Sequence, residues 1–278
     1  MARRVITPAS RVNGDLDLKV EPRYGNRTSR LYIGGRLLAY QEINLNLGSS
    51  VQNYRLGARA LADESIYRYC YNGGVALSAG VLVQSPVPPT DWKGLALVTN
   101  TVAGATSFTI TLGATTAVTL NQLAGGYLCC DAGAGGVGVR LRIAGNTAAT
   151  ATNPTTITTV DAAPVAFTAG THTFQFTMSP YMNVIVTPGT TPPTAKVLGA
   201  TICAVSINYY FWLCTRGPVV LTNTTGTPTS GQTAVASLTG VGTFDEAPAE
   251  WIATTMPIGT VRRTASGTGV TTVDLMLE

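Results

Sequence analysis

Side chains that could carry acid–base chemistry are few in this chain. Its single histidine, His172, lies in the alternating segment Thr-His-Thr-Phe-Gln-Phe. That alternation predicts a β-strand, in which a lone histidine is more often a surface or hydrogen-bonded core residue than a catalyst. An acid–base enzyme without histidine needs placed carboxylates or lysines instead.

The carboxylates and lysines of this sequence are too few and too scattered to suggest an acid–base pair. Beyond Lys19 the only lysines are Lys93 and Lys196, and the one acidic cluster is formed by Asp245, Glu246 and Glu250. This cluster lies in a proline-containing stretch, which predicts a solvated loop. A glycan hydrolase would need two facing carboxylates, and Asp245 with Glu250 is the only close candidate. We therefore predict no catalytic residues and no enzymatic activity.

Five cysteines are present, an odd number without a Cys-x-x-Cys motif: Cys70, Cys129, Cys130, Cys203 and Cys214. Two of them are adjacent in the sequence, and neighbours on a strand point to opposite faces, so this pair is poorly placed to bind one metal ion. We expect buried, reduced cysteines in a protein that folds in a cytosol, and no metal or cofactor.

A Gly-x-Gly-x-x-Gly motif at residues 133–138 matches the dinucleotide-binding pattern. In that pattern the third glycine opens a helix whose N-terminus holds the pyrophosphate. Here the next residues, Val-Arg-Leu-Arg-Ile, alternate with a period of two and predict a half-buried strand. The motif therefore indicates a glycine-rich hairpin connection rather than a nucleotide site.

The composition is that of an all-β protein. Charged residues make up 12% and hydrophobic residues 45% of the 278 residues, which argues against a disordered chain. Threonine, which favours strands, occurs 43 times, and 40 of these follow Val98. No apolar run approaches about 18 residues, and none follows the initial Met-Ala-Arg-Arg, so we expect neither a membrane span nor a secretory signal.

Positive charge is concentrated at the N-terminus. Residues 1–70 carry a net charge of +5, and residues 71–278 carry −1. Proline and glycine interrupt residues 1–36 without a sustained helical or strand period, which predicts an extended basic arm. Such an arm can dock on a partner through arginine–carboxylate pairs, or it can be a charged terminus that aids solubility. Nucleic acid is a third possible partner of this arm. The sequence has no recognised nucleic-acid-binding motif, so we expect no binding to nucleic acid.

The arginines expected to make these contacts with a partner are Arg3, Arg4, Arg11, Arg23, Arg27, Arg30 and Arg36.

Short strands at intervals of 8–12 residues predict small barrels or sandwiches. Residues 58–69 fit either a short helix or a hairpin between 59–62 and 65–69, and their alternation favours the hairpin. Proline-rich connectors lie at 85–89 and 187–193. We predict an all-β fold of two or three small β-barrel or β-sandwich modules with an extended basic N-terminal arm. The predicted division is an arm at 1–47, a hairpin segment and connector at 48–90, a β-module at 91–190 and a C-terminal β-module at 191–278.

Three stretches give the chain a resemblance to a known family. They are residues 68–83, residues 105–119 continuing through 124–128, and residues 209–219, where the aromatic run Tyr-Tyr-Phe-Trp-Leu-Cys leads into Thr-Arg-Gly-Pro. In this Gly/Thr/Ala-rich style the chain resembles the head decoration, or cement, proteins of tailed bacteriophages. The resemblance covers residues 68–130 and 195–278.

The resemblance implies a virion structural protein on the capsid surface, assembled in the host cytoplasm. Such a protein clamps neighbouring major capsid subunits with a rigid β-body and an adhesive arm, commonly as a homotrimer. It implies no catalytic residues.

Two other functions share this style of sequence. A tail-fibre or receptor-binding protein would present aromatic residues on loops, whereas Phe174, Phe176, Phe211 and Trp212 lie in strand patterns here. The usual tailed-phage shell fold needs a long spine helix that this sequence lacks, but a jelly-roll shell protein remains an alternative.

Overall fold

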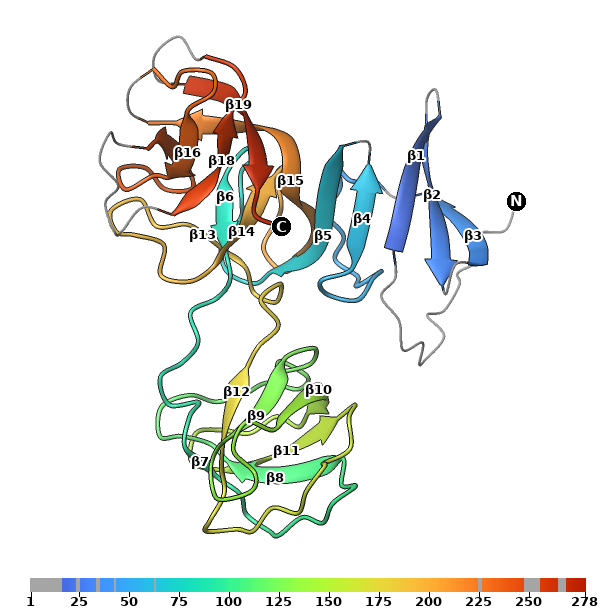
Figure 1. Ribbon diagram of the computed structural model, residues 1–278, viewed down its shortest axis with the longest axis vertical. Helices are drawn as coiled ribbons and strands as arrows, with labels where there is room; N and C mark the ends of the chain where they lie inside the picture. The colour runs from blue at the N-terminus through green and yellow to red at the C-terminus, as the bar shows by residue number, and fades with distance from the viewer. Residues whose placement is uncertain are drawn as a thin grey trace.

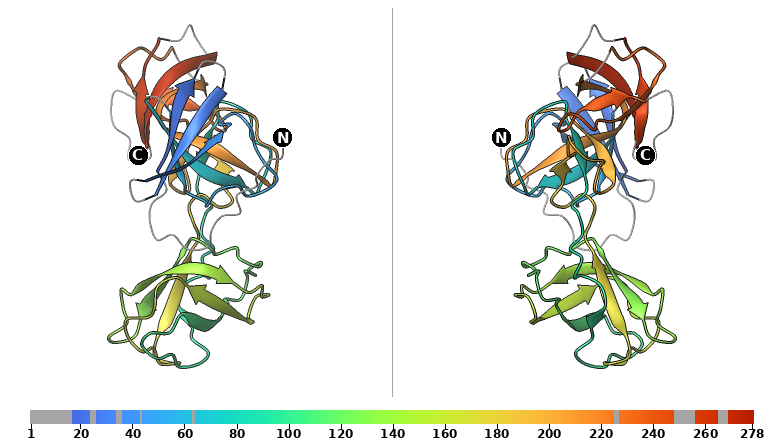
Figure 2. Two further views of the ribbon diagram at one scale, coloured as in Figure 1. Left: turned by 90° about the vertical axis from the view of Figure 1, so that its right-hand side faces the viewer. Right: turned by 90° about the vertical axis from the view of Figure 1, so that its left-hand side faces the viewer.

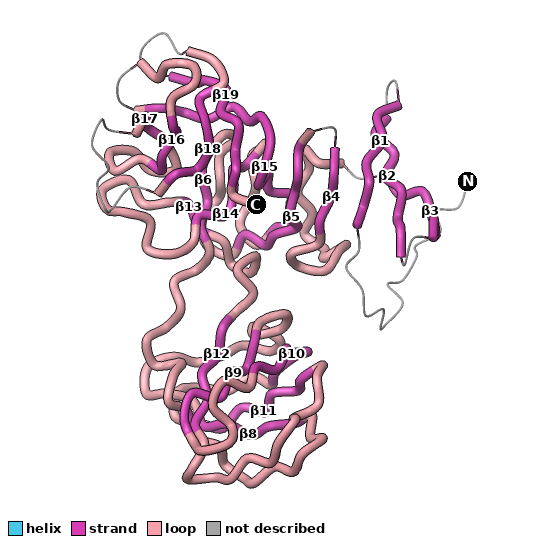
Figure 3. The backbone as a smooth tube through the Cα atoms, in the orientation of Figure 1, coloured by secondary structure: helices cyan, strands magenta, loops and turns pink. Residues whose placement is uncertain are grey.

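The computed structural model describes residues 17–23, 26–33, 36–42, 44–62, 64–224, 227–247, 256–264 and 269–278. All regular structure in these ranges is β-strand, as the composition predicts (Figure 3). A lower body built from β7–β12 is joined by two chain connections to an upper body that contains β1–β6 and β13–β19 (Figures 1 and 2). The lower body is thus an insertion within the upper one.

The lower body is a six-stranded antiparallel barrel in the order β7-β12-β9-β10-β11-β8. Its strands are β7 (Leu95–Ala96), β8 (Ser107–Thr111), β9 (Tyr127–Ala132), β10 (Arg140–Asn146), β11 (Pro154–Thr159) and β12 (Thr173–Thr177). The bridge between Leu97 and Ile110 brings β7 beside β8 and closes the sheet. Phe108, Phe167 and Phe174 pack against one another in the core of this body, which we call the inserted barrel.

The upper body is organised around one long strand, β15 (Tyr209–Asn223). Its second half pairs with β19 (Gly269–Met276), and the sheet continues through β18 (Pro257–Val261), β16 (Thr233–Ala236) and β17 (Phe244–Glu246). Asn223 of β15 pairs in parallel with Phe244 of β17, so the last strand of this series lies beside the first. These five strands form a second barrel-like unit.

The first half of β15 belongs to a third barrel-like unit. It lies between β5 (Ser65–Asn72) and β14 (Val197–Thr201), followed by β6 (Leu82–Gln84) and β13 (Ile185–Val186). A bridge between Asn72 and Val184 closes this unit around the buried side chains of Cys70, Val83 and Phe211. The pairing of β15 with β5 shifts register between Cys214 and Arg216, at the junction of the two units.

The predicted hairpin at 59–69 is confirmed. β4 (Arg59–Ala62) pairs antiparallel with β5, and Ala62 lies opposite Ser65. This hairpin lies in the same sheet as β15, although the sequence analysis divided residues 48–90 from 191–278.

The connections between the two bodies match the predicted connectors in one case only. Residues 85–89 form one connection, as expected. The other passes through residues 178–181, because Val184 already pairs with Asn72 and Ile185 with Gln84 in the upper body. The segment 187–193, predicted as a connector, is a loop that follows β13.

Strands occur where the sequence analysis expected none. β1 (Asp17–Arg23), β2 (Asn26–Ile33) and β3 (Arg36–Glu42) form an antiparallel meander, and β1 pairs parallel with β4. Glycines at positions 25, 34 and 35 fall between these strands and obscured their pattern in the sequence. The basic segment therefore extends the sheet of the upper body beyond β4 (Figure 1).

Candidate interaction surfaces

The seven arginines assigned to partner contacts fall into two groups. Arg3, Arg4 and Arg11 lie outside the described residues. Arg23 ends β1, Arg27 and Arg30 lie in β2, and Arg36 begins β3. The meander thus brings four of the seven positions onto three adjacent strands.

His172 is a hydrogen-bonded core residue, one of the two roles expected for it. It is buried just before β12, and its ring packs edge-on against Phe167. Nδ1 accepts the backbone N–H of Thr168 at 3.0 Å, so Nε2–H points to the carbonyl of Ala134 at 3.3 Å. Both ring nitrogens thus make hydrogen bonds to backbone groups, which is a structural role.

The glycine motif connects β9 to β10, which confirms the predicted hairpin. Gly133, Gly135 and Gly138 all have positive φ, a backbone conformation that glycine adopts without steric cost. A Cβ on Gly136 would lie 2.7 Å from Cδ2 of His172 and 2.9 Å from Phe167. These glycines therefore serve chain reversal and close packing.

The acidic cluster is placed differently from the predicted solvated loop. Asp245 and Glu246 lie in β17, paired with β16, and both are half-buried. Asp245 accepts a hydrogen bond from the hydroxyl of Thr224 at 3.2 Å. Glu250 lies outside the described residues. The prediction failed because three residues, Phe-Asp-Glu, are too few for a readable alternation.

The five cysteines are free thiols, and Cys70, Cys130 and Cys214 are buried. Burial raises the pKa of Cys214 to about 12 and the pKa of Cys70 well above its ordinary value. Because the thiolate is the reactive form, these thiols are poor nucleophiles. In the described ranges no group of three or more His, Cys, Asp or Glu side chains is arranged to hold a metal ion.

Asp91 anchors the start of the inserted barrel. Its carboxylate accepts hydrogen bonds from the hydroxyl and backbone N–H groups of Thr116 and Thr115, at 2.7–3.0 Å. These bonds lower the pKa of Asp91 to about 2. The carboxylate ties the entering chain to the loop after β8, and this is a structural role.

The inserted barrel has an end away from the connections that carries few charged residues. The loops 98–106, 133–139 and 160–172 meet there, since Thr101 pairs with Phe167, Gly104 donates to Ala163, and Gly136 packs on His172. We call these three loops the barrel tip.

The barrel tip exposes apolar side chains. Val102, Val137 and Val160 are 72%, 64% and 50% exposed. Aside from His172, Asp161 is the only ionisable residue in the three loops. Depletion of charge around exposed apolar groups is typical of the centre of a protein–protein interface. Sequence reasoning missed this surface because the valines are far apart in the chain.

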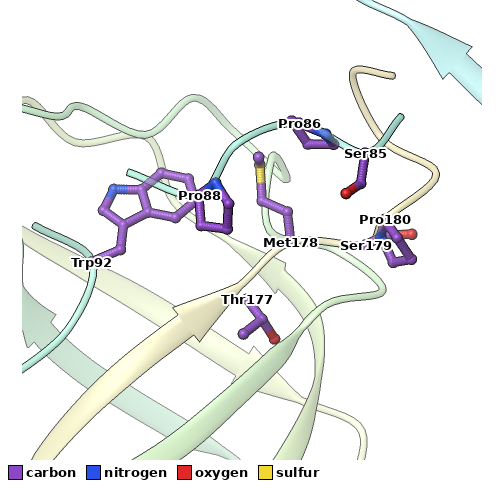
Figure 4. Close-up of a pocket in the computed structure, with 8 residues that line it drawn as sticks. All are labelled: Ser85, Pro86, Pro88, Trp92, Thr177, Met178, Ser179 and Pro180. Atoms are coloured by element: carbon purple, nitrogen blue, oxygen red, sulfur yellow. The ribbon is translucent and has the colours of Figure 1, made fainter. Parts of the chain in front are cut away.

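A small cavity of about 90 Å³ lies between the two connections. Trp92 and Pro88 lie on one side, Ser179 and Pro180 on the other, with Met178 between them (Figure 4). The proline residues restrict the backbone of both connections. The cavity therefore lies where the two connections approach each other.

No family model, curated protein or solved structure matches this chain. The described part of the chain contains no helix with the length and apolarity needed to cross a membrane.

Proposed function

We propose that this chain is a virion structural protein that decorates the outside of a phage head and clamps neighbouring major capsid subunits. The sequence resemblance suggests this function, and the barrel tip is the structural observation that supports it. A surface with a single carboxylate and three exposed valines suits burial against another protein rather than exposure to water.

Two further features support a clamp. The proline-stiffened connections hold the inserted barrel at a set position from the upper body, so two contacts on a shell would be held apart at a fixed spacing. The basic N-terminal segment supplies the second contact, through arginine–carboxylate pairs with the shell. The major capsid protein and other copies of this chain are the proposed partners.

Copy number tests the proposal most directly. Quantitative mass spectrometry of purified particles should find this chain at a level close to that of the most abundant shell protein. A small fraction of that level would favour a tail-fibre or receptor-binding protein, and absence from particles would refute a virion role.

The contribution of the barrel tip can be tested with point variants. Val102→Asp or Val137→Asp should weaken binding to undecorated shells at least about tenfold, because a carboxylate would be buried in the contact. Leu120→Asp is the matched control, since Leu120 is 68% exposed and lies on the same barrel near the connections. Equal binding by tip and control variants would contradict the tip's role.

The basic segment has its own test, deletion of residues 2–36. The truncated protein should occupy fewer shell sites than the full chain in the same binding assay. Full occupancy would show that the arginines do not provide the contact.

A further inference from the structure

Two arginines lie close together on the outer face of strand β10. Leu141 and Ile143 of this strand are buried in the core of the inserted barrel, so Arg140 and Arg142 point to the outside. Residues two apart on a strand are separated by about 7 Å along it. Arg142 lies opposite Tyr127 of β9. Both guanidinium groups therefore arise from the same stretch of barrel surface.

The guanidinium of Arg140 is held over an aromatic ring. Its Cζ lies 4.5 Å from the centre of the Tyr127 ring on the neighbouring strand. Stacking uses the flat face of the guanidinium and leaves the N–H groups at its edge open to an acceptor. The ring thus orients a fork of donors whose geometry suits a carboxylate.

Within the described ranges, neither guanidinium forms an ion pair with a carboxylate of this chain. Two carboxylates of the same barrel bind other groups instead. Asp161 accepts the backbone N–H of Arg142 at 3.1 Å. Asp131 accepts hydrogen bonds from the hydroxyl of Thr173 and the backbone N–H of Gly94. The side-chain donors of both arginines are therefore available to a partner.

This arginine pair borders the barrel tip. The loop 133–139, which carries the exposed Val137, leads directly into Arg140. The backbone N–H of Val160 donates to the carbonyl of Arg142 at 2.8 Å. A partner that covers the valines of the tip would therefore meet the arginines at the edge of the contact. Protein interfaces typically combine an apolar centre with a polar rim, and arginine is enriched in them.

The charge balance of the inserted barrel favours a protein partner over a polyanion. Residues 90–179 contain three basic and three acidic side chains, so their net charge is zero with His172 neutral. Nucleic acid is bound through a larger excess of positive charge. A protein surface offers both apolar groups for the valines and separate carboxylates for the arginines.

We propose that Arg140 and Arg142 form a carboxylate-binding rim beside the barrel tip, which pairs with acidic side chains on the protein surface that the tip contacts. This inference rests on the proposed function, because it assigns the chemistry of the shell surface that the tip would meet. The valines exclude water from the contact, and the arginines fix its orientation through charge-assisted hydrogen bonds.

Binding of the full chain to undecorated shells at two salt concentrations tests the pairing. Arg140→Gln and Arg142→Gln should each bind about tenfold more weakly than wild type at about 50 mM NaCl, because each removes charge-assisted hydrogen bonds. The difference from wild type should shrink at about 500 mM NaCl, where salt screens the charges. Arg140→Lys should recover only part of the binding, since lysine keeps the charge but lacks the planar fork.

Arg263→Gln is the matched control, because it removes the same charge at an exposed position beyond β18 in the upper body. It should bind as wild type does. Converting the shell carboxylates to amides with carbodiimide and glycinamide gives a second readout, and should remove the difference between wild type and Arg140→Gln. Unchanged binding by both glutamine variants would overturn this inference and leave the proposed function standing, whereas a wild type that does not bind shells would refute both.

Discussion

At the scale of single residues, several polar side chains stabilise the fold through hydrogen bonds to neighbouring groups. The imidazole of His172 satisfies two backbone groups, and the carboxylate of Asp91 accepts four hydrogen bonds from two threonines. Threonine is suited to this role because its branched side chain favours strands while its hydroxyl can bind a neighbouring group.

Asp91 makes the stability of the inserted barrel dependent on pH. Its pKa is about 2 in the folded protein against an ordinary value of 3.8, so its contribution is complete above about pH 4 and is lost as pH falls towards 2. Asp91→Asn should lower the melting temperature at pH 7 and flatten its decrease between pH 4 and 2. Thermal denaturation across this pH range measures the effect.

Asp274→Asn is the control for this experiment, because within the described ranges the carboxylate of Asp274 makes a partly exposed ion pair with Arg262 and no side-chain hydrogen bond to a threonine. An unchanged pH profile in Asp91→Asn would show that these hydrogen bonds do not set the acid sensitivity.

At the scale of elements, backbone conformation rather than ligand binding explains the glycine motif. The turn between β9 and β10 reverses direction over residues 133–139 and requires positive φ at three of its glycines. Glycine also permits the approach of His172 and Phe167 to the turn.

Gly138 allows the backbone requirement to be isolated, because its φ is +87° and a Cβ there would meet no atom within 4 Å. Gly138→Ala should destabilise the protein by roughly 1–2 kcal/mol through strain alone. Gly138→Asn should cost less, since asparagine tolerates the left-handed region. Chemical denaturation compares the three proteins, and equal stability of the alanine variant and wild type would contradict this account.

At the scale of the whole molecule, the inserted barrel has a hydrophobic core and a closed sheet of its own. Its buried hydrophobic cluster consists only of residues between Trp92 and Phe176, and its sheet closes on itself. Both ends of the insertion leave the upper body side by side, because Gln84 and Ile185 are antiparallel partners.

Residues 90–179 expressed alone should therefore fold with one cooperative thermal transition. The remaining chain, with residues 86–180 replaced by a short Gly/Ser linker, should also fold, since the linker only has to span one strand pair. Circular dichroism and thermal denaturation test both pieces. An unfolded isolated barrel would mean that its core depends on the upper body.

Local patterns in the sequence were sufficient for several features of this fold. They identified the all-β class, the hairpin of β4 and β5, the strand after the glycine motif and the buried aromatic residues Phe174, Phe176, Phe211 and Trp212. Each of these features follows from the alternation of apolar and polar residues, or from turn residues, within about ten positions of the sequence. Such local patterns can be recognised without knowing which strands are neighbours.

Only the tertiary structure decided which strands are neighbours. β5 pairs with β15 across more than 130 residues, β1 joins β4 in parallel, and the barrel tip gathers Val102, Val137 and Val160 from three loops. Strand alternation determines which face of a strand is apolar, but many partners could cover that face. The choice among them is made by packing and hydrogen bonding between distant segments, which no local window of sequence contains.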